Sequence, residues 1–244
     1  MLAAAAFAGS LVQATFGFGF AILAAPLFLV SMDSTGAIPV LAVLNLAVSA
    51  VVAAQIWRQA PGRLLGLLCA ASVAGFPIGL ALFRGADVSD LKLVTGLVIM
   101  MFALVLLARE RGHIALNRPG MEAKGPSWPI ALLVGALSGI MGAALAMPGP
   151  VAMLYISTIR LSRDQSRALS LAFFSFVYAA VCLLHAWDGA LTSERGWLSA
   201  KLLLAVLAGA IAGQWLSRHV PEARYRQLVL VILFVAGLYA VLSI

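Results

Sequence analysis

The chain has 244 residues, of which 63% are hydrophobic and only 10% are charged, and its mean hydropathy is +1.06. A water-soluble chain of this length needs more polar surface than these residues supply, so the composition excludes a soluble globular protein. The net charge of +7 does not indicate a nucleic-acid partner, because the basic residues lie between long apolar segments, as in the cytoplasmic loops of membrane proteins.

Eight apolar segments follow one another along the chain, separated by short polar stretches. They cover roughly residues 2–31, 36–56, 64–83, 91–108, 129–158, 168–187, 197–217 and 227–244. The longest polar stretch separates the fourth segment from the fifth and divides the chain nearly in half. We therefore expect a first transmembrane repeat at 1–111, a cytoplasmic linker at 112–126 and a second transmembrane repeat at 127–244.

The two halves share sequence features at corresponding places. A Gly-x-x-x-Gly motif followed five residues later by arginine occurs at 75–84 and again at 209–218. These glycines lie in uninterrupted segments, which favours close helix packing rather than a binding role. Asp33 and Asp164 each precede an apolar segment, and each is predicted to be a helix N-cap. An internal duplication explains this pattern.

The first and fifth segments are about 30 residues long, and glycines interrupt both. The first interruption is at 16–20; the second is at Gly139–Gly142, with Pro148 and Pro150 after it. About 30 residues are too few for two crossings of roughly 20 residues each, so we expect re-entrant pairs of half-helices. The polar loops then place twelve Lys or Arg on one side and four on the other, whereas eight crossings give equal numbers.

This count predicts an all-α integral membrane protein of two inverted repeats, each a broken or re-entrant helical hairpin plus three transmembrane helices. The twelve basic residues, Arg163 and Arg167 among them, are interpreted as orientation signals that place their loops in the cytoplasm. Inverted repeats with broken helices are typical of secondary transporters, in which the substrate binds near the midplane of the bilayer.

The two breaks are the predicted substrate site, because non-helical backbone at membrane depth is tolerated where it borders a cavity. Each half-helix begins with free N–H groups and a positive dipole end, which favour an anion. An unpaired amide such as that of Asn45 is costly in hydrocarbon, which indicates a polar partner. The predicted substrate-binding residues are Gln13, Thr15, Gly17, Phe18, Gly19, Asn45, Ser138, Gly142, Phe174 and Tyr178.

Other polar residues of the apolar segments are assigned simpler roles. Ser49 and Ser170 are expected to bond to the backbone of their own helices. Cys69 and Cys182 lie inside apolar segments without the spacing of a metal site, so we expect no metal ion, no cofactor and no catalytic residues. Two alternatives to a carrier stay open. They are an anion channel and an intramembrane serine protease, the latter with Ser138 and His185 as its dyad.

The stretch at 13–20, with Pro26 after it, resembles the first repeat of the TauE/SafE-type sulfite exporter and toluenesulfonate uptake permease family. The stretches at 138–142 and 147–150 are similar to the second repeat of that family. The resemblance covers essentially the whole chain. It implies a multi-pass inner-membrane transporter whose partners are the lipid bilayer and a sulfur-containing anion such as sulfite, sulfoacetate or an aryl sulfonate. The direction of transport and a homo-oligomeric state stay open.

Overall fold

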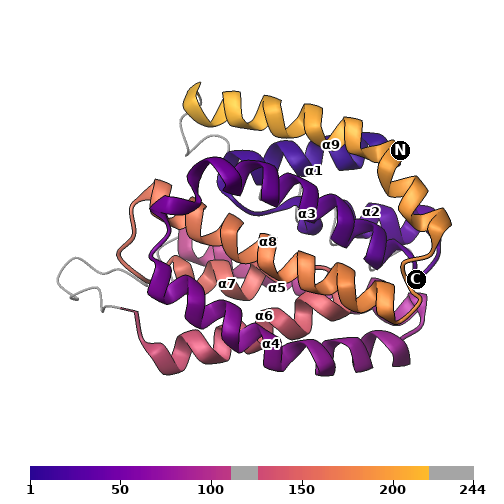
Figure 1. Cartoon of the computed structure of the whole chain (residues 1–244), viewed down its shortest axis with the longest axis horizontal. Coiled ribbons are helices and arrows are strands. Elements are labelled where there is room, and N and C mark those ends of the chain that lie inside the picture. Colours follow the sequence, from indigo (N-terminus) through magenta and orange to yellow (C-terminus); the bar gives the residue numbers. More distant parts are fainter. Residues whose placement is uncertain (111–125, 220–244) are drawn as a thin grey trace.

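The computed structural model describes residues 1–110 and 126–219, which form a bundle of helices (Figure 1). Nearly all of the predicted linker, and the whole predicted eighth segment at 227–244, lie outside the described residues. The first half contains α1 (Leu2–Phe16), α2 (Phe20–Met32), α3 (Ala37–Ile56), the 3-10 turn η1 (Trp57–Gln59), α4 (Gly62–Gly85) and α5 (Val88–Glu110). The second half contains α6 (Trp128–Leu145), α7 (Gly149–Ile156), α8 (Arg163–Trp187) and α9 (Ser193–His219).

The all-α membrane class is confirmed. In the part of the chain that the structure describes there is no strand, and six helices are long and apolar enough to cross a membrane. These candidate spans are Ala37–Gln59, Gly62–Gly85, Val88–Val105, Trp128–Leu145, Arg163–Trp187 and Ser193–Ser217.

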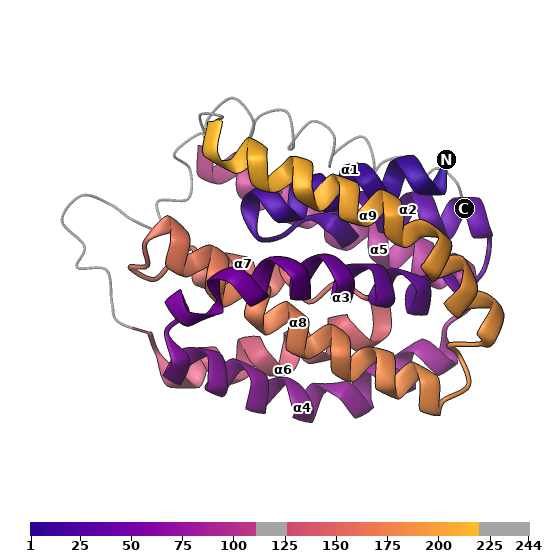
Figure 2. The same cartoon turned by 45° about the horizontal axis from the view of Figure 1, so that its top comes forward.

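The first and fifth apolar segments each form two consecutive helices. With 15 and 13 residues, α1 and α2 are each only about 20 Å long, which is short of the roughly 30 Å of a hydrocarbon core. In Figure 2 the chain enters α1 and leaves α2 at one end of the bundle, and it enters α6 and leaves α7 at the opposite end. By length α6 is a candidate span, whereas α7 has eight residues.

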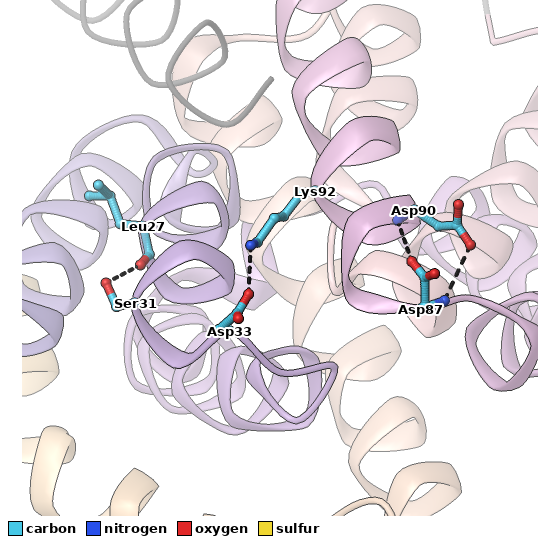
Figure 3. A network of polar contacts seen from close by, with 6 residues as sticks. All are labelled: Leu27, Ser31, Asp33, Asp87, Asp90 and Lys92. Atoms are coloured by element: carbon cyan, nitrogen blue, oxygen red, sulfur yellow. Dashed lines mark hydrogen bonds and ion pairs between the residues drawn. The ribbon is translucent and has the colours of Figure 1, made fainter. Parts of the chain in front are cut away.

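The two predicted aspartate N-caps are wrong. Asp33 ends α2 in the left-handed conformation (φ 42°), and Gly36 precedes α3 instead. The Asp33 carboxylate accepts a hydrogen bond from the Lys92 ammonium at 2.7 Å, and this bond joins the end of α2 to α5 (Figure 3). Asp164 lies inside the first turn of α8. Ser162 caps that helix because its hydroxyl accepts from the N–H of Gln165, while the Gln165 amide oxygen accepts from the N–H of Ser162.

Close packing by the first Gly-x-x-x-Gly motif is confirmed. A Cβ atom added to Gly75 would overlap the carbonyl oxygen of Ala136, and one added to Gly79 would overlap that of Ile140. Because neither glycine carries a side chain, α4 approaches the backbone of α6 directly.

The second motif packs in the corresponding way. A Cβ atom on Gly209 would overlap the carbonyl oxygen of Phe7, and one on Gly213 would overlap that of Leu11. The third apolar segment of each half therefore packs on the broken segment of the other half, α4 on α6 and α9 on α1. Between these pairs α3 and α8 lie against each other.

Candidate functional site

The first break lies where the sequence predicts it. Helix α1 ends at Phe16, and Gly17 (φ 87°) and Gly19 (φ 114°) have left-handed conformations before α2 begins at Phe20. Glycine adopts these conformations without the steric cost that a Cβ atom adds. The positive φ angles of Gly17 and Gly19 reverse the direction of the chain between α1 and α2.

The second break lies further along the chain than predicted. Helix α6 continues through Gly139 and Gly142 to Leu145, and the chain turns at Ala146 (φ 52°) and Pro148. The placement of the break at Gly139–Gly142 is therefore wrong. The N–H of Ala146 bonds to the carbonyl of Gly142, as the N–H of Gly17 bonds to that of Gln13 at the first break.

The glycines of α6 serve packing. A Cβ atom on Gly139 would overlap the carbonyl oxygen of Ser72 on α4, and one on Gly142 would lie 2.7 Å from Cγ1 of Val177 on α8. A helical glycine costs only about 1 kcal/mol relative to alanine, so tight contacts of this kind are enough to retain it. Gly142 thus lies one turn before the break, facing α8.

The side chain of Gln13 bridges three helices at the first break. It is almost fully buried, its amide oxygen accepts from the N–H of Phe20 at 3.2 Å, and its amide nitrogen donates to the Ser49 hydroxyl at 2.6 Å. The expectation that Ser49 bonds to its own helix is wrong, since its partner is on α1. Ser170 does bond to its own helix, at the Arg167 carbonyl. Gln13 therefore caps the start of α2 and fixes the break against α3.

Thr15 faces the neighbouring α9. Its hydroxyl lies 2.7 Å from the carbonyl oxygen of Leu11 and 3.0 Å from that of Gly213. It therefore helps hold α1 against α9. Phe18 lies in the break itself, with its ring 6.1 Å from that of Phe102 on α5.

Asn45 and Ser138 are fully buried with unused hydrogen-bonding capacity. Asn45 donates to the Leu41 carbonyl at 2.9 Å, but among the described residues neither its side-chain oxygen nor the hydroxyl of Ser138 has a hydrogen-bond partner. Asn45 lies one helical turn before Ser49, on the face of α3 that meets Gln13. Buried polar atoms nearly always have partners, so these two atoms are candidates for contact with water or a ligand.

Ser138 and His185, the dyad of the alternative serine-protease interpretation, are not hydrogen-bonded to each other. Nε2 of His185 lies 3.1 Å from the Ala143 carbonyl oxygen, and its ring contacts Phe83 at a centroid distance of 4.5 Å. The arrangement is that of a histidine packed between α8, α6 and α4.

Aromatic side chains close the second break. The hydroxyl of Tyr178 donates to the Ala146 carbonyl at 3.1 Å, and the rings of Phe174 and Tyr178 are 6.4 Å apart. A Cβ atom on Gly149, the first residue of α7, would lie 3.6 Å from Cζ of Phe174. Phe174 and Tyr178 are therefore together at this break, whereas Phe18 belongs to the other.

Arg167 is the residue whose position the sequence did not predict. Interpreted above as an orientation signal, it lies beside the first break, where one of its terminal nitrogens donates to the Ala14 carbonyl. A Cβ atom on Gly17 would lie 3.2 Å from Cα and Cγ of Arg167 and 2.7 Å from the Ser170 hydroxyl. A signal was available in the spacing, because residues 167, 170, 174 and 178 follow one face of a helix.

Both breaks thus contact α8 on either side of its middle. Ser170 at the first break and Tyr178 at the second are two turns apart, about 12 Å along the axis. Gln13, Gly17, Gly19 and Arg167 meet at the first break. Among the described residues, no group of three or more His, Cys, Asp or Glu is placed to hold a metal ion.

A comparison with known protein families gives a match over nearly the whole chain. Residues 1–240 match the family described as sulfite exporter TauE/SafE. The chain belongs to this family. No curated protein and no solved structure matches it. Family and apolar helices together define a multi-pass membrane transport protein, whose partners are the bilayer and a small anion.

Proposed function

We propose that the protein is a carrier for a sulfur-containing oxyanion, an organosulfonate or sulfite, which binds near the two helix breaks. The observation that carries this proposal is the pair of breaks beside the middle of α8. At the first break the first N–H groups of α2 precede the first hydrogen bond within that helix, and among the described residues the Gln13 amide oxygen caps that of Phe20. Free N–H groups and the positive end of the helix dipole both favour an anion there.

The chemistry of the ligand fits neutral donors. A sulfonate spreads one charge over three oxygens, so several N–H and O–H groups can share it. Asn45 and Ser138 each have a buried polar atom that no group in the described part of the chain bonds, and Gln13 and Thr15 lie on the last turn of α1. In this proposal Phe18, Phe174 and Tyr178 flank the rest of the substrate.

Inverted repeats at 1–111 and 127–244 are part of the same proposal. Its support is that α4 packs on α6 as α9 packs on α1, in each case by glycine against a carbonyl oxygen. Two halves with equivalent contacts can exchange conformations about a central site, which is the geometry of alternating access. We assign the end that carries η1 and the start of α8 to the cytoplasm of a cell with an inner membrane, from its basic residues.

Counterflow in proteoliposomes tests the carrier function. Purified protein is reconstituted, loaded with one unlabelled anion, and assayed for uptake of a labelled one from a panel of sulfite, taurine, sulfoacetate and toluenesulfonate. A carrier gives saturable uptake that internal substrate accelerates, whereas a channel gives flux without exchange. Indifference to every anion in the panel, with a response to cations, would overturn the proposal.

The side-chain assignment has a matched control on the same helix. Asn45→Ala should weaken binding of the transported anion by roughly 5- to 10-fold, the effect of one neutral hydrogen bond. Gln55→Ala, which removes an exposed amide near the C-terminal end of α3, should leave binding unchanged. Equal affinities in both variants would place the site elsewhere.

A further inference from the structure

A polar cavity lies at the start of α9, at the end of α3 opposite η1. Its volume is about 360 Å³, within the range of small-ligand sites, and residues from the end of α2, the turn after it and the first turns of α9 line it. Glu194, Trp197 and Lys201 follow one another at intervals of three and four, so they share one face of α9. Arg195 and Ser34 also line the cavity. It therefore combines two cations, a carboxylate and a hydroxyl away from both helix breaks.

The outer face of α9 indicates the depth of this cavity in the bilayer. Helix α9 runs along one edge of the bundle (Figure 1), and Trp197, Leu204, Ile211 and Trp215 are all exposed along it. The two tryptophans are 18 positions apart, about 27 Å along a helix, which is close to the roughly 30 Å of a hydrocarbon core. Tryptophan favours the two bilayer interfaces, so Trp197 marks the level of the lipid headgroups.

Two basic residues of the cavity have no carboxylate partner in residues 1–110 and 126–219. The other two basic residues at this end, Arg84 and Lys92, each form an ion pair with an aspartate, whereas Arg195 and Lys201 form none there. The ammonium of Lys201 lies 5.9 Å from the centroid of the Trp197 ring. Since a lysine one turn inside the apolar part of a helix extends its flexible chain toward the interface, this charge also lies at headgroup level.

The guanidinium of Arg195 is held in place by backbone groups. Its Nη1 donates to the Ala190 carbonyl, and a Cβ atom on Gly36 would lie 2.3 Å from its Nε. The glycine that precedes α3 therefore leaves the room that this side chain occupies. A guanidinium has five N–H groups, so the bond to Ala190 leaves others that can face a ligand. A donor whose position is already fixed loses less entropy when it binds an oxyanion.

We propose that this cavity binds the headgroup of the phospholipid phosphatidylethanolamine. Arg195 and Lys201 bind the phosphate, for which basic pockets at the membrane surface are suited. Glu194 accepts from the N–H groups of the ethanolamine ammonium, whereas a headgroup without a cation would meet a like charge there. The order along α9 fits the lipid, because Glu194 is seven residues, about 10 Å, nearer the helix end than Lys201. In the lipid the ammonium is terminal, and the phosphate is attached to the glycerol.

The test compares three lipids that share the phosphate and differ beyond it. Native mass spectrometry of the whole delipidated protein in detergent measures the affinities of phosphatidylethanolamine, phosphatidylcholine and phosphatidylglycerol with identical acyl chains. Phosphatidylcholine keeps the cation but has no N–H group to donate, and phosphatidylglycerol has no cation. Inorganic phosphate and glycerophosphoethanolamine, which has the headgroup without acyl chains, are added as soluble competitors.

The variants are Lys201→Gln and Glu194→Gln, with Arg58→Gln as the control. Arg58 lies beyond the other end of α3, and its guanidinium is 5.8 Å from the centroid of the Trp57 ring. The control therefore matches Lys201 in charge and in its contact with a tryptophan, but not in position. Lys201 and Glu194 are both exposed, so neither substitution disturbs the core.

We expect the wild type to bind phosphatidylethanolamine most tightly of the three lipids. Lys201→Gln should weaken all three by a similar factor, roughly 2- to 5-fold, the effect of one ion pair in contact with solvent. Glu194→Gln should weaken phosphatidylethanolamine by a similar factor and strengthen phosphatidylglycerol, because it removes a partner of the ammonium and a like charge. Arg58→Gln should change none of these affinities.

Four results would overturn the inference. Equal wild-type affinities for the three lipids would reject selection of ethanolamine. A loss of all three lipids by the same factor in Glu194→Gln would show a merely structural role for that carboxylate. Equal losses in Lys201→Gln and Arg58→Gln would show only a general attraction between charge and lipid. Displacement of the lipid by an equal concentration of either soluble competitor would assign the cavity to a soluble oxyanion. None of these lipids is the transported anion, so failure of the counterflow assay would not change this test.

Discussion

The Asp33–Lys92 ion pair offers a stability test, because removing one partner should lower the stability more than removing the other. The side chain of Lys92 is only 9% exposed, whereas that of Asp33 is 73% exposed. Removing the carboxylate therefore leaves a buried ammonium without its partner, while removing the ammonium leaves a carboxylate in contact with solvent. Asp33→Asn is the appropriate change because asparagine also tolerates the left-handed conformation of this residue.

The loss of stability expected for each variant follows from the solvent exposure of the two side chains. Breaking a fully buried pair costs about 3–5 kcal/mol, and the solvent around Asp33 reduces this to about 1–2 kcal/mol for Asp33→Asn. For a chain of this size that corresponds to an apparent Tm about 3–6 °C lower. Lys92→Met should stay within about 2 °C of wild type, because exposed pairs contribute less than about 1 kcal/mol and methionine fills the apolar space.

The assay is thermal unfolding of the detergent-solubilised protein, followed by the fraction that remains monodisperse after heating. The double variant Asp33→Asn/Lys92→Met is the internal control and should regain the stability of Lys92→Met alone. Two results refute the reasoning. One is an unchanged apparent Tm in Asp33→Asn, and the other is a larger loss in Lys92→Met than in Asp33→Asn.

Three further predictions concern packing, the second break and topology. Gly75→Ala should sharply lower the yield of folded protein, because the added Cβ atom meets a carbonyl oxygen of α6. Gly66→Ala on the same helix places its Cβ atom in open space and should leave the yield unchanged. Equal yields of the two variants would contradict this packing. Tyr178→Phe should lower the apparent Tm by about 2–4 °C through loss of roughly 1 kcal/mol of hydrogen bonding, and an unchanged Tm would show that bond to be unimportant. Cysteines placed at Arg63 and Glu194 should be labelled from opposite sides of the membrane, and labelling of both from one side would reject the predicted topology.

The helices and the first break could be predicted because each depends on local sequence. Apolar length predicts the spans, and Gly17 and Gly19 permit conformations that residues with a Cβ atom adopt only at a cost. The second break was misplaced because Gly139 and Gly142 look alike in sequence whether they break a helix or pack it. What decides between these roles is Ser72 on α4 and Val177 on α8, which the local sequence does not contain.

The polar contacts of the site were harder to predict for the same reason. Gln13 was correctly placed near the first break, but its bonds to Phe20 and Ser49 depend on how α1, α2 and α3 meet. Arg167 looks like any loop arginine until α8 is placed against α1. A basic residue in the first turns of a membrane helix is usually an orientation signal, so only the tertiary contact distinguishes it.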